Sequence, residues 1–294
     1  MESSYPLNPL QSALIAWWAD HGRDLPWRRS RDPWAVLVSE TMLQQTQVAR
    51  VTERWERFLR RFPTVATCAA SPRSEVVDEW AGLGYNRRAV FLHRAAQDCV
   101  DRFGGELPTS LPELQSLPGI GPYTARAVLV FAHERDIGLV DTNAGRFVAR
   151  AVAGASLTPA VAQTVADDAV PEGWGWTWGQ AVFDLGATIC HRRNPDCDRC
   201  PIRGDCAWAV AGCPVPDPVE GSAGVSAPQS RFEGSDRQGR GRLVDVLRRR
   251  AVADHELADV MGWPDDPQRA KRVAVSLIDD GLAVHDNGRW HLPD

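Results

Sequence analysis

Four cysteines lie close together near residue 200, and their spacing constrains the fold more than any other feature of the chain. The pattern C-x6-C-x2-C-x5-C is formed by Cys190, Cys197, Cys200 and Cys206, in a sequence with seven cysteines in all. Thiolates packed into so short a segment bind either zinc or an iron–sulfur cluster. Structural zinc sites usually use two short C-x2-4-C pairs, and only one is present here. We therefore predict a compact loop that holds a [4Fe–4S] cluster, with zinc as the alternative.

The rest of the chain has a helical pattern and a globular composition. At 294 residues with 44% hydrophobic residues, it can bury the core of two domains and a smaller piece. Apolar residues recur at helical spacing over 33–62, 87–105, 110–133 and 159–169, which predicts a mainly α fold. No signal peptide or membrane span is expected, so we expect a cytoplasmic protein, associated with the nucleoid if bacterial. In that reducing compartment clustered cysteines favour metal over disulfides.

The net charge of −5 does not indicate a nucleic-acid partner. Residues 1–213 hold 22 basic against 24 acidic residues, and no segment forms a basic arm. Binding to DNA would therefore depend on local patches and on backbone N–H groups.

The composition changes after Cys213. Residues 214–238 are rich in Pro, Gly and Ser and are typical of a linker. Three short helical patterns follow in 239–294, and they lead into two alternating strands around an Asn-Gly pair at 287–288. This order predicts a small winged-helix-like module.

A Gly-x-Gly turn opens a helix in LPGIGPYTARAV, residues 117–128. Gly119 and Gly121 would let backbone N–H groups approach an anion at a helix N-terminus. A turn between two packed helices explains the glycines equally well. The order of this hairpin, an Asp-bearing segment and the cysteine pattern resembles the endonuclease III / MutY superfamily of base-excision DNA glycosylases, and SETMLQQTQV at 39–48 resembles the MutY adenine-glycosylase motif.

The resemblance implies a two-lobed helix–hairpin–helix DNA glycosylase fold with an iron–sulfur cluster loop. It implies a six-helix domain at 28–133, which includes the hairpin at 117–128. Residues 1–27 and 134–213 would form the iron–sulfur domain. The match covers about 11 to 213, and 239–294 are too few for the Nudix-like domain that usually follows in this family.

Glu40 is the candidate acid. It lies four residues after Val36 and three before Leu43, so helical geometry places it on an apolar stripe. Lost hydration would raise the pKa of its carboxyl group and favour the neutral acid. A solvated side chain is the ordinary alternative for a single Glu on a helix. The resemblance implies that Glu40 protonates adenine, which is a poor leaving group until protonated.

Asp141 precedes a helix in IGLVDTNAGRFVAR, so a helix N-cap would explain it if it stood alone. The segment resembles the family's V-D-G-N pattern, with Thr142 in place of the glycine. The resemblance implies that Asp141 stays ionised and stabilises an oxocarbenium-like sugar, and that Asn143 helps to organise the site.

Tyr123 stands where bifunctional relatives of the endonuclease III type have the lysine that forms a Schiff base. The sequence contains one lysine, Lys271, so residues 1–270 have none. The resemblance therefore implies a catalytic position at Tyr123 and a monofunctional enzyme.

Further positions match the family motifs one by one. Arg28, in the L-P-W-R motif, is expected near the flipped base or Glu40, and Tyr85 in GLGYNRRA is the expected wedge beside 8-oxoguanine. Asn86 replaces the second tyrosine of that motif. The predicted DNA- or base-contacting residues are Arg28, Gln44, Gln45, Thr46, Leu83, Tyr85, Gly119, Gly121, Gln180, Arg192 and Arg193.

The resemblance implies a monomeric adenine DNA glycosylase of base-excision repair that acts on double-stranded DNA with adenine opposite 8-oxoguanine or guanine. Two alternatives stay open: an endonuclease III-like pyrimidine glycosylase/lyase, and a non-enzymatic iron–sulfur DNA-binding regulator. Tyr123 and Glu40 argue against the first. The second would leave Glu40, Asp141 and the glycine hairpin without a role.

Overall fold

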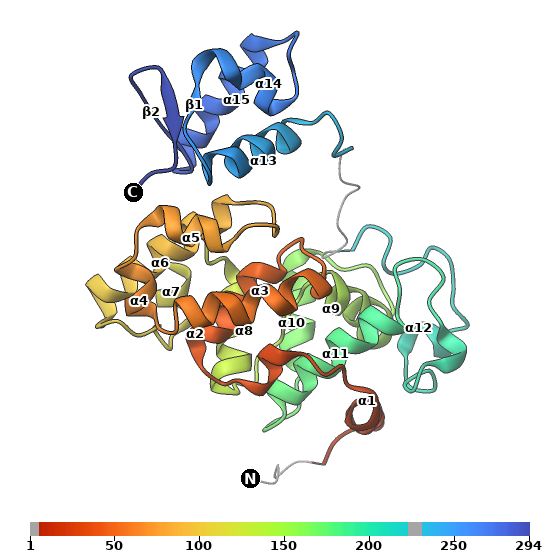
Figure 1. Cartoon of the computed structure of the whole chain (residues 1–294). Coiled ribbons are helices and arrows are strands. Elements are labelled where there is room, and N and C mark those ends of the chain that lie inside the picture. Colours follow the sequence, from red (N-terminus) through yellow and green to blue (C-terminus); the bar gives the residue numbers. More distant parts are fainter. Residues whose placement is uncertain (1–5, 223–230) are drawn as a thin grey trace. The chain divides into compact units, whose positions relative to one another are not determined.

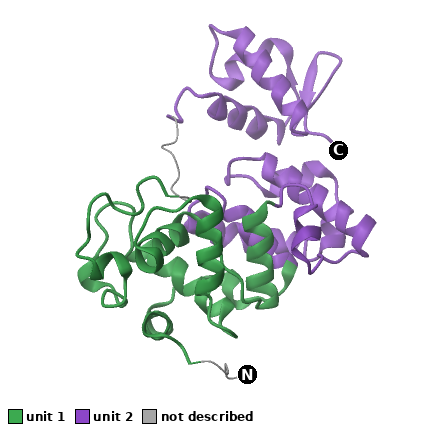
Figure 2. Cartoon of the chain, turned by 180° about the vertical axis from the view of Figure 1, so that it is seen from behind, with its two compact units in different colours: residues 1–33, 121–228 green, residues 34–120, 229–294 purple. Residues whose placement is uncertain are grey.

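The computed structural model describes residues 6–222 and 231–294, and helices dominate it (Figure 1). The chain divides into two compact units. Unit 1 is formed by residues 1–33 and 121–228, and unit 2 by residues 34–120 and 229–294 (Figure 2). The predicted mainly α fold is confirmed. Among the described residues, no helix has the length and apolar character needed to cross a membrane.

Unit 1 contains the helices around the cysteine loop. Its elements are α1 (Pro9–His21), the 3-10 turn η1 (Pro26–Arg29), α8 (Pro122–His133), α9 (Thr142–Phe147), the π-helical turn η2 (Val148–Ala153), α10 (Pro159–Ala169), α11 (Gly175–Thr188), the 3-10 turn η3 (Cys197–Arg199) and α12 (Ala207–Val210). Helix α11 packs against both α1 and α9. Leu14, Phe147 and Ile202 belong to one core, so the cysteine loop shares its apolar support with these helices.

The helix starts in unit 1 follow from local sequence. Asn8 caps α1, because its side-chain oxygen accepts the N–H of Gln11 at 2.9 Å and the Gln11 side chain accepts the N–H of Asn8 at 3.0 Å. Thr158 caps α10, which begins with Pro159, a residue with no N–H to leave unpaired. Caps of this kind depend on neighbours in sequence, and the helix predicted at 159–169 has those bounds in the structure.

Unit 2 begins with six helices: α2 (Pro33–Leu43), α3 (Val48–Arg61), α4 (Val65–Ala69), α5 (Arg73–Glu79), α6 (Arg87–Phe103) and α7 (Leu111–Gln115). Helix α6 packs against α4 and α5. The segment 33–62 forms two helices, as predicted, and α6 covers most of the helix predicted at 87–105.

The C-terminal module, residues 231–294, completes unit 2. Its elements are α13 (Asp236–Leu247), β1 (Val252–Ala253), the 3-10 turn η4 (Asp254–Glu256), α14 (Leu257–Met261), α15 (Pro267–Asp279), β2 (Val284–Asp286) and β3 (Arg289–His291). The three helices and the hairpin are those predicted. Asn287 and Gly288 form the hairpin turn with left-handed φ values of 45° and 71°. That the module belongs to the winged-helix class stays a prediction.

The sheet of the module has the order β1–β3–β2, with both pairings antiparallel. Val252 lies opposite Trp290 in the first pairing, and His285 lies opposite Trp290 in the second. The sequence analysis missed β1, because a strand of two residues is too short to show alternation.

The linker predicted at 214–238 is too long at both ends. Residues 214–222 pack on unit 1, where Val219 is 3% exposed and the Ser222 hydroxyl accepts the N–H of Leu157 at 3.0 Å. Helix α13 already begins at Asp236, and 223–230 lie outside the described residues. The Pro, Gly and Ser content of this segment predicted a linker, but composition gives no information on hydrogen bonds to distant residues such as that between Ser222 and Leu157.

The two compact units also differ from the predicted domains. The hairpin helix α8 belongs to unit 1, so the chain passes between units after Ile120 and not after residue 133. The C-terminal module is grouped with residues 34–120 and does not form a separate unit.

Candidate active site and metal centre

Glu40 lies near the end of α2, a helix that is buried on all sides. Nine of its eleven residues are buried, and Glu40 itself is 6% exposed. The neighbouring hydroxyls of Ser39 and Thr41 each donate to a carbonyl of the preceding turn at 2.8 Å. The predicted burial of Glu40 is confirmed, and a carboxyl group in such surroundings loses hydration.

Two loops of unit 2 present Gln45 and Tyr85. Both residues are exposed and have left-handed backbones, with φ values of 56° and 46°. Such values are uncommon for residues other than glycine, and they persist where the surroundings hold the backbone in place. The strain therefore lies at two of the positions predicted to contact DNA.

Arg88 joins these two loops from inside. Its guanidinium is buried and donates at 2.6 to 3.3 Å to the carbonyl oxygens of Thr41, Met42, Gln44, Leu83 and Gly84 and to the hydroxyl of Thr46. Burial lowers the pKa of Arg88 to about 10, so the side chain still carries its charge at neutral pH. The structure thus brings the predicted residues Gln44, Thr46 and Leu83 around one buried cation.

Gln44 and Gly119 line the same pocket of unit 2, together with Arg88. Leu83, by contrast, has a buried side chain that is 4% exposed. Its carbonyl oxygen accepts the Thr46 hydroxyl of the neighbouring loop at 3.3 Å. Leu83 thus packs against its neighbours in this structure, and its contact with DNA stays a prediction.

The Gly-x-Gly turn connects α7 with α8, and its glycines serve different purposes. Gly119 has a φ of 76°, and a Cβ there would lie 2.6 Å from the Cβ of Phe91, so no other residue fits. Gly121 has an ordinary φ of −83° and caps α8 without a side-chain hydrogen bond. Open space surrounds its missing Cβ, so nothing crowds the start of α8 at this position. Tyr123 follows in the first turn, half-buried beside Phe183.

Asp141 is the N-cap of α9, as the ordinary reading of its sequence predicts. One carboxylate oxygen accepts the N–H groups of Asn143 and Ala144 at 2.8 and 2.7 Å, and the other accepts the Asn143 amide at 3.2 Å. Burial raises the pKa of Asp141 above its ordinary value, while these donors and the Arg146 charge act to lower it. Part of the residue stays exposed although protein atoms surround the carboxyl group. A structural cap and a chemical role are compatible here.

Arg146 extends this network toward the cysteine loop. Its guanidinium donates to the Asn143 side-chain oxygen at 2.7 Å and to the carbonyls of Gly186 and Cys190 at 2.6 and 2.9 Å. Gly186 allows α11 to approach, because a Cβ there would lie 2.7 Å from the Cβ of Asn143. A continuous chain of hydrogen bonds thus connects the Asp141 carboxylate with the first cysteine of the loop.

Asp184 anchors the N-terminal segment of unit 1 to α11. Its side chain is fully buried and accepts both terminal nitrogens of Arg28 at 2.7 Å, the Arg23 side chain at 2.6 Å and the Trp18 indole at 3.1 Å. Burial acts to raise the pKa of Asp184, but the two arginines hold it below its ordinary value. The predicted base-contacting residue Arg28 is therefore engaged in a buried ion pair.

Gln180 is 5% exposed on α11, so it is not the surface amide that a single Gln would ordinarily be. It lies one helical turn before Asp184 on the same face of the helix. Gln180 stays a candidate for contact with a base, because hydrogen bonds hold a buried polar side chain in one orientation.

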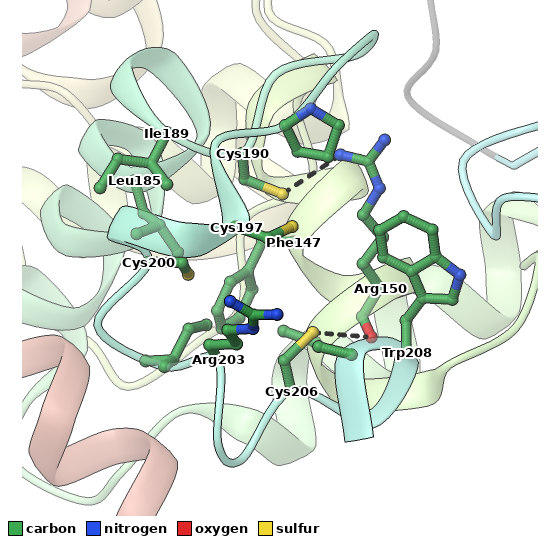
Figure 3. A pocket seen from close by; sticks show the side chains of 14 residues that line it. Phe147, Arg150, Leu185, Ile189, Cys190, Cys197, Cys200, Arg203, Cys206 and Trp208 are labelled. Carbon is green, nitrogen blue, oxygen red and sulfur yellow. Dashed lines mark hydrogen bonds between the residues drawn. The ribbon is translucent and has the colours of Figure 1, made fainter. Parts of the chain in front are cut away.

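The four cysteines line one pocket of unit 1, and Figure 3 shows their side chains around it with Arg150 and Trp208. No disulfide joins any two of these four. Thiolates are the form that binds iron, so these residues would hold a cluster as thiolates. Apolar walls from Phe147 and other residues exclude water, which suits a cluster held by thiolates. In the described chain no three His, Cys, Asp or Glu side chains are placed to hold a single metal ion.

Arg150 supports this pocket with a buried positive charge. It is 1% exposed and donates to the Cys190 sulfur at 3.4 Å and to the His191 carbonyl at 2.6 Å. Burial acts to lower its pKa, but Asp217 and Cys190 raise it above the ordinary value. The predicted phosphate-contacting residues Arg192 and Arg193 follow in the loop, and both are exposed.

Sequence reasoning missed the buried charges Arg88, Arg150 and Asp184 and the half-buried Arg146. A signal was present for some of them. Arg88 shares one helical face with Leu92, Ala95 and Cys99, all of which are buried, and Asp184 interrupts the apolar run AVFDLGA. A charge on an apolar face predicts burial with a partner, but the partner lies far away in sequence.

Residues 38–170 match the family described as HhH-GPD superfamily base excision DNA repair protein, and residues 190–206 match the iron–sulfur binding domain of endonuclease III. The second match begins and ends at the outer cysteines of the pocket. The chain therefore carries an iron–sulfur cluster of the [4Fe–4S] type, as predicted.

An adenine DNA glycosylase of Mycolicibacterium smegmatis is 40% identical over 284 residues, covering 95% of this chain and 94% of that protein. An adenine DNA glycosylase of Mycobacterium tuberculosis is 39% identical over 294 residues, covering 95% of this chain and 92% of that protein. Among solved structures, a thermostable thymine-DNA glycosylase matches with a TM-score of 0.62 and 26% identity, over 68% of this chain and 94% of that one. With its helix–hairpin–helix, its cysteine loop and these relatives, the chain belongs to the adenine DNA glycosylase family and is a DNA N-glycosylase of base-excision repair.

Proposed function

We propose that this enzyme is a monofunctional glycosylase that removes adenine from DNA where it lies opposite 8-oxoguanine or guanine. The observation that carries the proposal is the burial of Glu40, 6% exposed within the apolar helix α2. Burying a carboxyl group costs hydration free energy, and buried carboxyl groups of this kind are concentrated at functional sites. Donation of a proton to a purine is the role that we assign to Glu40.

In the proposed reaction Glu40 gives its proton to N7 of the extruded adenine. The C1′–N9 bond then breaks, the bonding electrons leave with the base, and positive charge develops on the sugar. The Asp141 carboxylate stabilises this charge, held in direction by Asn143 and the N–H of Ala144. Water adds to C1′ and loses a proton, so the products are free adenine and an abasic site.

The absence of a lysine amine supports a monofunctional reaction. Tyr123 occupies the first turn of α8, and its phenol cannot form a Schiff base with the sugar. The one lysine of the sequence, Lys271, lies on α15 of the C-terminal module. Strand cleavage through a lysine adduct in the hairpin helix is therefore not expected.

Contacts to duplex DNA are proposed at three places. Gln45 and Tyr85 would enter the base stack and offset the cost of extruding adenine, and Gln180 would read that base. The open N-terminus of α8 at Gly121 would bind a phosphate with its N–H groups. Arg192 and Arg193 would contact the backbone near the cysteine loop. We propose that the enzyme does this as a monomer in the cytoplasm or nucleoid.

Cys190, Cys197, Cys200 and Cys206 are the proposed ligands of the [4Fe–4S] cluster. Hydrolysis of an N-glycosidic bond transfers no electron, so the bound cluster would supply a rigid cross-link within the loop. Arg150 would balance the negative charge of the thiolates through its contact with Cys190.

Single-turnover assays on three duplexes test the proposal. The duplexes carry adenine opposite 8-oxoguanine, adenine opposite guanine, and an oxidised pyrimidine opposite guanine. We expect abasic product from the first two, and no covalent enzyme–DNA adduct when borohydride is added. Excision of the pyrimidine alone, or a borohydride-trapped adduct at the active-site sugar, would place the enzyme with the endonuclease III type. Abasic product from none of the three would refute the proposal.

A further inference from the structure

The loop that carries Tyr85 contacts the C-terminal module at three consecutive residues. The Arg237 guanidinium donates to the Tyr85 hydroxyl at 3.0 Å, and the Arg248 guanidinium donates to the Asn86 side-chain oxygen at 3.0 Å. Arg87 forms an ion pair with Asp280 at 3.1 Å. All of these residues belong to unit 2.

Arg248 is the anchor of this contact. Its side chain is 6% exposed, and besides Asn86 it donates twice to the Val77 carbonyl, at 3.0 and 3.3 Å. Asp245 on the same helix balances the charge of Arg248, and the three bonds to Val77 and Asn86 hold those two partners in place. The Val77 carbonyl belongs to α5, so Arg248 ties α13 of the module both to α5 and to the Tyr85 loop.

Asn86 supplies the hydrogen-bond acceptor on the Tyr85 loop for the C-terminal module. The family motif has a second tyrosine at this position, whereas a short amide with an accepting oxygen stands here. That oxygen is the acceptor for Arg248. On the other side of the module contact, Gly281 has a φ of 72° and leaves so little room that a Cβ would lie 2.9 Å from the Arg94 guanidinium. The module surface is therefore shaped to fit the helices that carry the loop.

The Tyr85 loop is thus held from two sides. Arg88 binds it from within, through the carbonyls of Leu83 and Gly84, and the module binds it from without. Tyr85 itself is 40% exposed and keeps its left-handed backbone between these two supports. A strained residue that is fixed by its surroundings has a defined direction in advance of binding, which lowers the entropy that binding must overcome.

We propose that the C-terminal module positions the Tyr85 loop through Arg248 and thereby sets how strongly the enzyme prefers adenine opposite 8-oxoguanine over adenine opposite guanine. Arg248 is a positioning residue in this proposal, and Arg237 orients the Tyr85 hydroxyl. The proposal rests on the proposed function, because it assigns the module a part in the choice of the opposite base. A module that only stabilises the fold would affect both mispairs equally.

The test compares full-length Arg248→Ala, Asn86→Ala and their double variant with wild type, and uses Arg249→Ala as the matched control. Arg249 is the next residue and is exposed. Two quantities are measured: the ratio of single-turnover rates on the two mispairs, and the hydrogen exchange of the backbone amides at 83–87. Thermal unfolding of each variant establishes that it is folded.

We expect Arg248→Ala to lower the rate ratio by about threefold to thirtyfold and to speed exchange at 83–87. Arg249→Ala should change neither. Asn86→Ala should give a smaller loss, because Arg248 keeps its bonds to Val77, and the double variant should be no worse than Arg248→Ala. If Arg248→Ala does not fold, Asn86→Ala carries the test alone, since it leaves Arg248 bound to Val77 and Asp245.

An unchanged rate ratio in a folded Arg248→Ala or Asn86→Ala variant would overturn the proposal, and so would equal losses on both mispairs. If wild type removes adenine from neither duplex, the proposed function fails and the assigned choice of base fails with it. The exchange measurement then decides separately whether the module positions the loop, because faster exchange at 83–87 requires no activity.

Discussion

Glu40 and Asp141 lie in different parts of the fold, one within a buried helix and the other at the start of a helix. Glu40 lies on α2, where nine of eleven residues are buried and most are apolar. Asp141 begins α9 in a polar network, where two backbone N–H groups and the Asn143 amide donate to its carboxylate. Loss of hydration favours the neutral form of a carboxyl group, and at Asp141 the donors oppose this effect, but its pKa stays above the ordinary value. Carboxyl groups in such different settings can divide the work of a glycosidase, with one giving a proton and the other stabilising positive charge.

The comparison also shows that the two settings are built differently. Glu40 is positioned by α2, whose nine buried residues are consecutive in the sequence. The surroundings of Asp141 depend on Arg146, Gly186 and Cys190, so they require α11 and the cysteine loop to be in place. We therefore expect the position of the Asp141 carboxylate to depend more on residues distant in sequence than that of the Glu40 carboxyl group.

Replacement of the proposed acid should have the largest effect on the reaction. Glu40→Gln removes the proton but keeps the shape, so we expect single-turnover excision of adenine to fall about 10²- to 10⁴-fold. Glu53→Gln, an exposed position on α3 in the same unit, is the matched control and should keep the wild-type rate. DNA affinity is measured in parallel. A Glu40→Gln enzyme with the full rate would show that the buried helix does not supply the acid.

Loss of the buried carboxylate Asp184 should have the largest effect on stability. Asp184→Asn leaves the guanidiniums of Arg28 and Arg23 without their counter-ion, and we expect about 3–5 kcal/mol lower free energy of unfolding in denaturant titrations. Asp24→Asn disrupts the exposed pair with Arg29, in which Asp24 is 73% exposed, and should cost at most about 1 kcal/mol. Equal losses for both variants would contradict the assigned anchoring role.

The link between Asp141 and the cysteine loop should have an intermediate effect. Arg146→Ala removes the bonds to Asn143 and to the Cys190 carbonyl, and we expect the excision rate to fall about 10- to 100-fold, as for residues that orient a reactive group. Arg199→Ala, whose side chain is 79% exposed in the same loop, serves as the control. The iron content of both variants is measured by absorbance. A rate loss with full iron content would locate the effect at Asp141, whereas an unchanged rate would break the proposed link.

The smallest expected effect concerns the pH dependence of stability. Because the pKa of Asp141 is raised in the folded protein, the native state holds this proton more tightly than the unfolded chain does. Wild type should therefore lose stability relative to Asp141→Asn as pH rises from about 3.8, the ordinary value, through the folded pKa. Above that window the difference should stay constant. Denaturant titrations of both proteins across pH measure it, and a wild type that gains stability relative to Asp141→Asn over this window would reverse the assigned direction.

Features that depend on neighbours in sequence could be predicted. The helices at 33–62 and 159–169 follow from apolar spacing and caps, and the Asn287-Gly288 turn follows from its left-handed backbone. The gathering of four cysteines in one pocket follows from their spacing, because the whole set spans residues 190–206. Burial of Glu40 could be predicted from its apolar stripe on α2.

Features that depend on distant partners could not be predicted. The ion pair of Arg28 with Asp184 joins residues 156 positions apart. The sequence motif predicted Arg28 near the base or Glu40, but it did not predict this partner. The segment 214–222 has a linker composition, yet Asp217 pairs with Arg150 and fixes it to unit 1. Leu83 matches a family motif, but its burial is visible only once α6 and its loop are folded together.

The division of roles between Glu40 and Asp141 is tested most directly by changing the leaving group. A duplex is made in which adenine is replaced by a purine with electron-withdrawing substituents, so that the base departs without being protonated. Single-turnover rates are measured for wild type, Glu40→Gln and Asp141→Asn on this duplex and on the adenine duplex. If Glu40 donates the proton, the Glu40→Gln defect should nearly vanish with the activated base, while the Asp141→Asn defect should persist, because the sugar still becomes positive. Equal defects of Glu40→Gln on both duplexes would contradict the account.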